Sequence, residues 1–203
     1  MTPMNEVPPA PPHGLRERKK ARTRAAIREH ALRLFREQGY HATTVEQIAE
    51  AAEVSPSTFF RYFPTKEDVV LQDDVDVLGM GMFDAQPADL SPIAAFRAAT
   101  AAMFAAMTPE DLARFRETIA MTFQVPEVRA RALDEFTRTI DEIAAAVAKR
   151  VGHSPDDFAV RNLAGALIGV VMAATMPWDS PPSEEMFGRI DAGLAHLEAG
   201  LPL

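Results

Sequence analysis

Apolar residues recur every three or four positions along almost the whole chain, which is the spacing of helices with one buried face. In the first such stretch, from about Arg16 to Gln38, the residues Ile27, Ala31 and Phe35 form the apolar stripe. No stretch of strand length alternates apolar and polar residues convincingly. The pattern therefore predicts an all-α protein.

Three short helices are expected after the first one, each marked by residues that favour a helix start. A hydroxyl side chain can accept the unpaired N–H groups of a first turn, and proline fits there because no N–H is needed. The start signals are Thr44 with Gln47, Ser55 with Pro56, and Thr65 with Asp68. Phe59, Phe60, Tyr62 and Phe63 make the third helix rich in aromatic residues.

Proline and glycine residues divide the remainder of the chain into longer helical segments. Gly79 and Gly81 are expected to interrupt the chain before the first of these segments. The segments are expected at about 91–107, 109–124, 127–150, 155–176 and 183–199. With the four helices at the front, about nine helices are expected.

The organisation predicted from these segments has three parts. Residues 1–14 form a proline-rich leader with too few apolar residues to pack, so it is expected to be disordered. Residues 15–67 contain two short capped helices separated by a turn, which is helix-turn-helix geometry. In that geometry the second helix lies in the major groove of DNA. Residues 68–203 form a helical body.

The stretch 43–71, T-T-V-E-Q-I-A-E-A-A-E-V-S-P-S-T-F-F-R-Y-F-P-T-K-E-D-V-V-L, resembles the TetR family of bacterial regulators. The matching positions are Thr44, Ile48, Ala49, Ala52, Val54, Ser55, Phe60, Tyr62, Phe63, Lys66 and Glu67. The resemblance implies a three-helix DNA-binding domain followed by an effector-binding and dimerisation domain. Glu53 and Ser57 depart from the family, which often has glycine there. If Glu53 has a positive φ, the strain costs about 1 kcal/mol.

Roles in DNA binding follow from this resemblance and from position on the helices. The candidate contact residues are Thr44, Pro56, Ser57, Thr58, Phe60, Arg61, Tyr62 and Lys66. The first residues of the recognition helix face base edges, whereas Thr44 and Lys66 are suited to phosphates. Phe60 is either a contact to a thymine methyl or sugar, or a core residue. The basic run 16–24 is either an arm for a minor groove or a solvated helix start.

The distribution of charge supports a separate DNA-binding part. The net charge of the chain is −8, which is unfavourable for a polyanion partner. Residues 15–67, however, contain 11 Lys and Arg against 7 Asp and Glu, and the rest contains 10 against 22. A basic N-terminal part joined to an acidic body is compatible with a protein that contacts DNA through its N-terminal part alone.

A methionine- and phenylalanine-rich set in the body is a candidate ligand pocket, because methionine adapts to irregular apolar ligands. Each member could equally be an ordinary core residue. The set comprises Met103, Phe104, Met107, Phe115, Ile119, Phe123, Met172, Met176 and Trp178. The segment 115–133 also resembles an actinobacterial subgroup of the family, of which some members sense acyl-CoA-like compounds.

The two last helices, at about 155–176 and 183–199, are expected by resemblance to pair with a second copy as a four-helix bundle. The alternative is that their apolar stripes belong to the core of a single chain. One reading surface is too short to select a genomic site, so a homodimer on a pseudo-palindromic operator is expected.

Several other classes of protein find no support in the sequence. Cysteine is absent, which excludes disulfides and thiolate metal sites. The five histidines are scattered, and no metalloprotease, nucleophile-elbow or phosphate-loop motif is present. We therefore expect no enzyme, metal or cofactor. There is no uninterrupted apolar run of 18 residues and no secretory signal, so a cytoplasmic location without a membrane partner is expected.

The leading hypothesis is a transcriptional repressor that an unidentified small hydrophobic effector releases from double-stranded DNA. A ligand-independent architectural DNA binder is the first alternative, and it predicts a body without a large cavity. An all-α enzyme with an incidental helix-turn-helix is the second.

Overall fold

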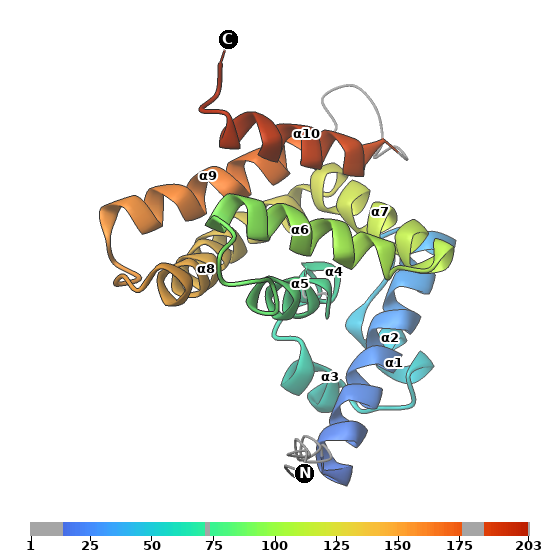
Figure 1. Ribbon diagram of the computed structural model, residues 1–203. Helices are drawn as coiled ribbons and strands as arrows, with labels where there is room; N and C mark the ends of the chain where they lie inside the picture. Colours follow the sequence, from blue (N-terminus) through green and yellow to red (C-terminus); the bar gives the residue numbers. More distant parts are fainter. Residues whose placement is uncertain (1–13, 72–73, 176–184, 203) are drawn as a thin grey trace. The chain divides into compact units, whose positions relative to one another are not determined.

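The computed structural model describes residues 14–71, 74–175 and 185–202. These residues form ten α-helices and no strand, which confirms the all-α class (Figure 1). The chain divides into two compact units, with the boundary between Lys66 and Glu67. The first unit contains α1 (Leu15–Gln38), α2 (Val45–Ala51) and α3 (Pro56–Tyr62).

The core of the first unit forms where α1 packs against α2 and α2 packs against α3. Ile27 and Phe35 from α1, Ile48 from α2, and Phe59 and Phe63 at α3 are buried. The spacing that predicted an apolar stripe on α1 is therefore confirmed, and Phe59 and Phe63 are core residues.

The second unit contains seven helices. They are α4 (Asp68–Leu71), α5 (Asp74–Asp84), α6 (Pro92–Ala105), α7 (Pro109–Gln124), α8 (Pro126–Val151), α9 (Phe158–Thr175) and α10 (Met186–Glu198). Helix α8 packs against α9, and α10 packs against both α9 and α6 (Figure 1).

Helix α5 corrects the expectation that Gly79 and Gly81 interrupt the chain, because it runs through both glycines. It packs against α6 and α8 and buries Phe83 in their shared core. A Cβ at Gly79 would lie 3.4 Å from the Met103 sulfur of α6, which is an ordinary van der Waals contact. Tertiary packing therefore overrides the low helix propensity of glycine here.

Helices α6 and α7 begin close to the predicted segment starts at about 91 and 109, and both have capped first turns. The Ser91 hydroxyl accepts the Ala94 N–H at 3.1 Å, and proline occupies the first turn. Thr108 and Asp111 form a capping box at α7. The hydrogen bond from the Thr108 hydroxyl is the main cause that lowers the pKa of the Asp111 carboxyl below its ordinary value. Both helices therefore begin within one residue of the predicted positions.

The core of the second unit contains many small residues, which let the helices approach closely. Its buried members are Phe83, Ala95, Ala99, Ile143, Ala144, Val147, Ala148, Val160, Ala164, Leu167, Ile168, Met186, Ile190 and Leu194. The closest approach involves Gly193 of α10, where a Cβ would lie 2.7 Å from a methyl group of Val170 on α9.

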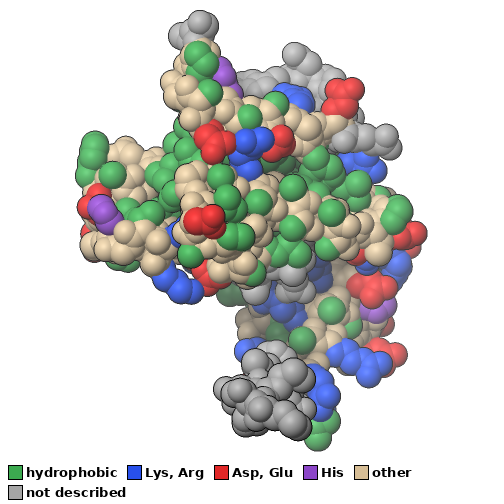
Figure 2. All heavy atoms as spheres, in the orientation of Figure 1, with side chains coloured by type: hydrophobic (Ala, Val, Ile, Leu, Met, Phe, Trp, Pro, Cys, Tyr) green, Lys and Arg blue, Asp and Glu red, His purple; other side chains and the backbone are tan. Residues whose placement is uncertain are grey.

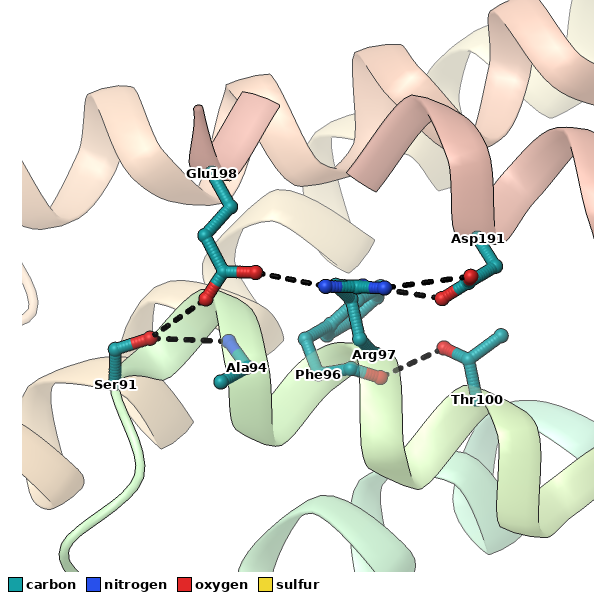
Figure 3. Close-up of polar contacts among 7 residues, drawn as sticks. All are labelled: Ser91, Ala94, Phe96, Arg97, Thr100, Asp191 and Glu198. Carbon is teal, nitrogen blue, oxygen red and sulfur yellow. Dashed lines mark hydrogen bonds and ion pairs between the residues drawn. The ribbon is translucent and has the colours of Figure 1, made fainter. Parts of the chain in front are cut away.

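An ion-pair cluster ties α10 to α6 (Figure 3). The Arg97 guanidinium of α6 donates to Asp191 at 3.0 Å and to Glu198 at 2.8 Å, both on α10. The hydrogen bond with Asp191 is the largest cause, and that with Glu198 the next, that raises the pKa of the Arg97 guanidinium above its ordinary value. A single side chain thus bridges two turns of α10.

Helix α9 is, within the described residues, the one helix that is long and apolar enough to cross a membrane. This is weak evidence by itself, because a core helix of a soluble protein has the same length and composition. Only 28% of the residues of α9 are buried within the chain.

We expect Gly193→Ala to lower the free energy of unfolding by about 1–3 kcal/mol, because Val170 is β-branched and cannot rotate away easily in a helix. Chemical denaturation followed by circular dichroism measures this change. Gly81→Ala is the matched control, since a Cβ there meets no atom within 4 Å. Equal stability of the two variants would show that α9 and α10 do not pack this closely.

Candidate DNA interface and ligand cavity

Helix α2 begins at a complete capping box. The Thr44 hydroxyl accepts the Gln47 N–H at 3.3 Å, and the Gln47 side chain accepts the Thr44 N–H at 2.9 Å. Gln38, the last residue of α1, donates to the same Gln47 oxygen at 2.9 Å and to the Thr43 hydroxyl at 3.2 Å. Thr44 is exposed, so this network holds an accessible hydroxyl at a helix N-terminus.

The turn between α2 and α3 contains the backbone strain that a non-glycine residue was expected to cause. Glu53 has a φ of 53°, which lies in the left-handed region. The Val54 N–H donates to the Ala49 carbonyl at 2.9 Å and closes the turn. The residue is thus held in a conformation that favours glycine.

The N-terminus of α3 displays a cluster of hydroxyl groups. The Ser55 hydroxyl accepts the Thr58 N–H at 3.1 Å, as predicted for an N-cap. It also lies 2.9 Å from the hydroxyls of both Ser57 and Thr58. Pro56 and Ser57 are exposed and Thr58 is half-buried. These three residues form the accessible tip of the helix.

The aromatic residues of α3 divide between its two faces. Phe59 and Phe63 are buried, whereas Phe60 is 50% exposed and meets Phe59 edge to face. Arg61 is exposed and its guanidinium lies 5.4 Å from the ring centre of the half-buried Tyr62. Phe60 and Arg61 are therefore available to a partner on the solvent side.

Lys66 makes contacts within the first unit that the sequence did not indicate. Its ammonium group donates to the carbonyls of Tyr40 and Thr43 at 3.0 Å each and lies 4.0 Å from the Tyr40 ring centre. The side chain thus fastens the end of unit 1 to the turn before α2.

The basic run 16–24 also divides in two. Arg16, Arg18, Lys19, Lys20 and Arg22 are exposed, and Figure 2 shows Lys and Arg side chains on the surface of α1. Arg24 is half-buried and lies 4.9 Å from the ring centre of Phe63. Arg24 thus contributes to the packing of α1, and the residues before it remain accessible.

A cavity of about 540 Å³ lies within the second unit, among α4, α7, α8 and α9. Four predicted pocket residues line it, namely Phe115, Ile119, Phe123 and Met172. A second cavity of about 230 Å³ is lined by Met103, Phe104, Phe115 and Ile119 from the predicted set. The cavities share six lining residues: Phe115, Ile119, Thr139, Ile168, Val171 and Thr175.

The remaining members of the predicted pocket set lie elsewhere. Met107 lines neither cavity, because it follows the C-cap of α6 at Ala106 and leaves the helical stripe. Met176 and Trp178 lie outside the described residues. The cavity residues Val70 and Leu71, which come from α4, are not part of the methionine- and phenylalanine-rich set.

A buried ion pair fixes α4 next to this cavity. Asp68 is fully buried, and its carboxylate accepts a hydrogen bond from Arg131 Nε at 3.0 Å. Arg131 belongs to α8, between the lining residues Ala130 and Ala132. The pair therefore joins two walls of the larger cavity. Within the described parts of the chain, no group of three His, Asp or Glu side chains could hold a metal ion.

The fold and the geometry of α2 and α3 define a helix-turn-helix DNA-binding protein. The family model for bacterial regulatory proteins of the tetR family matches residues 27–72, and the model for the MftR C-terminal domain matches residues 90–202. The chain belongs to the TetR family of bacterial regulators. It is a DNA-binding transcriptional regulator.

Two regulators are similar to most of the chain. TcmR of Streptomyces glaucescens is 35% identical over 185 residues, which cover 87% of this chain and 81% of TcmR. The putative mycofactocin biosynthesis regulator MftR of Mycobacterium tuberculosis is 28% identical, with 91% and 93% covered. Both are described as transcriptional regulators.

Solved structures agree with this assignment. FadR of Thermus thermophilus, a TetR-family repressor in complex with lauroyl-CoA, is 27% identical with a TM-score of 0.56. The match covers 89% of this chain and 95% of that one. A putative TetR-family regulator of Syntrophomonas wolfei, at 19% identity and a TM-score of 0.63, has the same fold over 91% and 98%.

We expect Lys66→Met to weaken binding to all DNA sequences about equally and to reduce the slope of log affinity against log salt by about one. The loss of two carbonyl contacts should also lower the free energy of unfolding by about 1–2 kcal/mol. Fluorescence anisotropy and chemical denaturation measure the two effects. Lys149→Met, which removes an exposed ion pair with Asp84, is the control. An unchanged salt slope would remove the phosphate role, and unchanged stability would remove the role in the turn.

Proposed function

We propose that the protein is a homodimeric repressor that leaves a pseudo-palindromic operator when a small apolar ligand occupies its cavity. The observation that carries this proposal is the cavity of about 540 Å³, whose lining is mostly apolar. Pockets of this size and character hold small molecules. A ligand-independent architectural DNA binder would need no such space.

The position of α4 supports a coupling between ligand and DNA. Val70 and Leu71 line the cavity, and α4 is the first helix after the boundary at Lys66. A ligand that displaces α4 from α8 must disturb the buried pair of Asp68 with Arg131. A ligand shifts the equilibrium only by its preference for one state, so it must bind the released form more tightly.

For DNA recognition we propose that Pro56, Ser57 and Thr58 approach base edges, and that Phe60 contacts a thymine methyl or a sugar. The remaining residues of the interface, for which we propose phosphate contacts, are Thr44, Arg61, Tyr62 and Lys66. The exposure of Thr44 at the start of α2 and of Arg61 on α3 supports these roles, and Tyr62 and Lys66 are half-buried. The exposed Ser57 hydroxyl adds a polar group at the tip of α3 that can alter base preference.

For the dimer we propose that α9 and α10 pack against their copies. Helix α9 is strongly apolar, yet only 28% of its residues are buried within one chain. Gly169 and Ala173 are exposed one turn apart, and a Cβ at Gly169 would meet no atom within 4 Å. A second copy would cover this face, which also accounts for the apolarity of α9 without a membrane. We also propose that the protein is cytoplasmic. Since its relatives are transcriptional regulators, we propose that it is not an enzyme.

The ligand-release step is tested with an operator obtained by selecting genomic fragments with the purified protein. Lauroyl-CoA and 1-decanol serve as apolar probes, and anisotropy of the labelled operator measures release. We expect Thr139→Phe, which fills the junction of the two cavities, to abolish release by either probe. Thr137→Phe on the exposed side of α8 is the control. Release that persists in Thr139→Phe, or fails with both probes in the unaltered protein, would contradict the proposal.

The dimer is tested by placing a charge on α9. We expect Ala173→Glu to convert the dimer to a monomer at micromolar concentration, because the charge would be buried without a partner. Analytical ultracentrifugation measures the change, and Ala113→Glu on the exposed side of α7 is the control. A dimer that survives Ala173→Glu would place the interface elsewhere.

A further inference from the structure

The larger cavity has an opening along one side of α8. Pro126, Arg129, Ala130 and Leu133 line the cavity and are nevertheless exposed, with Leu133 at 65%. Their spacing of three, four and seven residues places them on one face of the helix. Thr118, Ile168 and Thr175 are buried and form the inner wall. A ligand that entered along α8 would keep one end at this face and the other end inside.

The charges of the lining are distributed unequally. Arg129 and Glu135 are its ionisable residues. The Glu135 carboxylate pairs with Arg138, and the nearby Arg131 is held by Asp68 and Asp134. Arg129 makes no ion pair with any residue that the structure describes. The opening therefore carries one positive charge that no acidic side chain among residues 14–71, 74–175 and 185–202 pairs with.

Among the described residues that line the two cavities, Arg129 is the one Lys or Arg side chain, so the buried part contains no second cation. The hydroxyls of Thr122, Thr139 and Thr175 donate to backbone carbonyls of their own helices, at 2.9, 3.1 and 2.8 Å. Their protons are thus already used within the helix. An anionic group would be poorly solvated among the apolar side chains there, whereas it could keep both water and a cation at the opening.

From this arrangement we propose that the cavity binds amphiphiles with a hydrocarbon chain and one anionic head group, with the head group held by Arg129. The chain lies among Phe115, Ile119 and Met172. Because the second cavity shares six lining residues with the first, a long unbranched chain can extend toward Met103. This inference rests on the ligand cavity of the proposed function and specifies the class of ligand.

Four probes with the same ten-carbon chain test the head group: decanoate, decyl phosphate, 1-decanol and decyltrimethylammonium. Isothermal titration calorimetry of the full chain near neutral pH measures their affinities. We expect at least one anion to bind about tenfold more tightly than 1-decanol, the gain typical of a charge-assisted contact. A preference between decanoate and decyl phosphate distinguishes a carboxylate ligand from a phosphate ligand.

Variants of Arg129 test the residue. Arg129→Gln should lower the affinity for the preferred anion about tenfold and change the affinity for 1-decanol much less. Arg129→Lys should retain most of the preference, and Arg129→Glu should favour decyltrimethylammonium. Arg114→Gln is the matched control, because Arg114 pairs with Asp111 on the surface of α7 and lines neither cavity. Thermal unfolding verifies that each variant is folded.

The outcomes separate this inference from the proposed function. Equal binding of all four probes would overturn the head-group preference and leave the apolar ligand in place. An anion preference that survives in Arg129→Gln would overturn the role of Arg129. Failure of every probe to bind the unaltered chain would overturn both this inference and the proposal that the cavity binds an apolar ligand.

Discussion

Helix α8 is packed tightly along one half and lines a cavity along the other, and the second unit depends on this contrast. In its C-terminal half, Ile143, Ala144, Val147 and Ala148 are buried against the neighbouring helices. The small alanines let α9 approach closely, so this half is fixed by van der Waals contact. In the N-terminal half, eight residues between 126 and 139 line the cavity of about 540 Å³. The same helix thus provides both closely packed core contacts and one wall of the cavity.

An ion pair also connects the N-terminal half of α8 to α4. Near the cavity, Arg131 compensates the buried carboxylate of Asp68, and removal of either partner would leave a charge without compensation in the interior. The ion pair therefore stabilises one arrangement of α4 against α8. A ligand can change this arrangement only if it binds the altered conformation much more tightly than the original one. This property suits a regulator that must respond to a bound ligand and remain stable without one.

In the first unit, side-chain hydrogen bonds connect the end of α1 and the segment after α3 to the turn before α2. Helices of seven residues are marginal in isolation, so their positions come from contacts with other segments. Lys66 binds the carbonyls of Tyr40 and Thr43, and Gln38 binds Gln47 at the start of α2. These contacts fix the turn before α2 and hold the Thr44 hydroxyl at the start of that helix.

Much of the architecture followed from the sequence because the signals were local. The period of apolar residues indicated the all-α class, and the capping residues Thr44 and Ser55 together with the breaks at proline indicated most helix starts. The family resemblance of residues 43–71 indicated the helix-turn-helix. These features depend on neighbours within one turn of helix, which the order of residues specifies directly. Positions on the surface of α3 could be assigned for the same reason.

Other features depended on contacts between segments far apart in the chain. Helix α5 forms despite two glycines because α6 and α8 cover it, and Lys66 meets Tyr40 across 26 residues. The methionine- and phenylalanine-rich set located part of the cavity but missed Val70, Leu71 and Arg129. A residue type reveals that a side chain is apolar or charged, whereas the packing of several helices decides whether space remains beside it. The sequence by itself thus determined the class of protein and its reading helix, and only the tertiary structure decided where a ligand could enter and which charge it would meet.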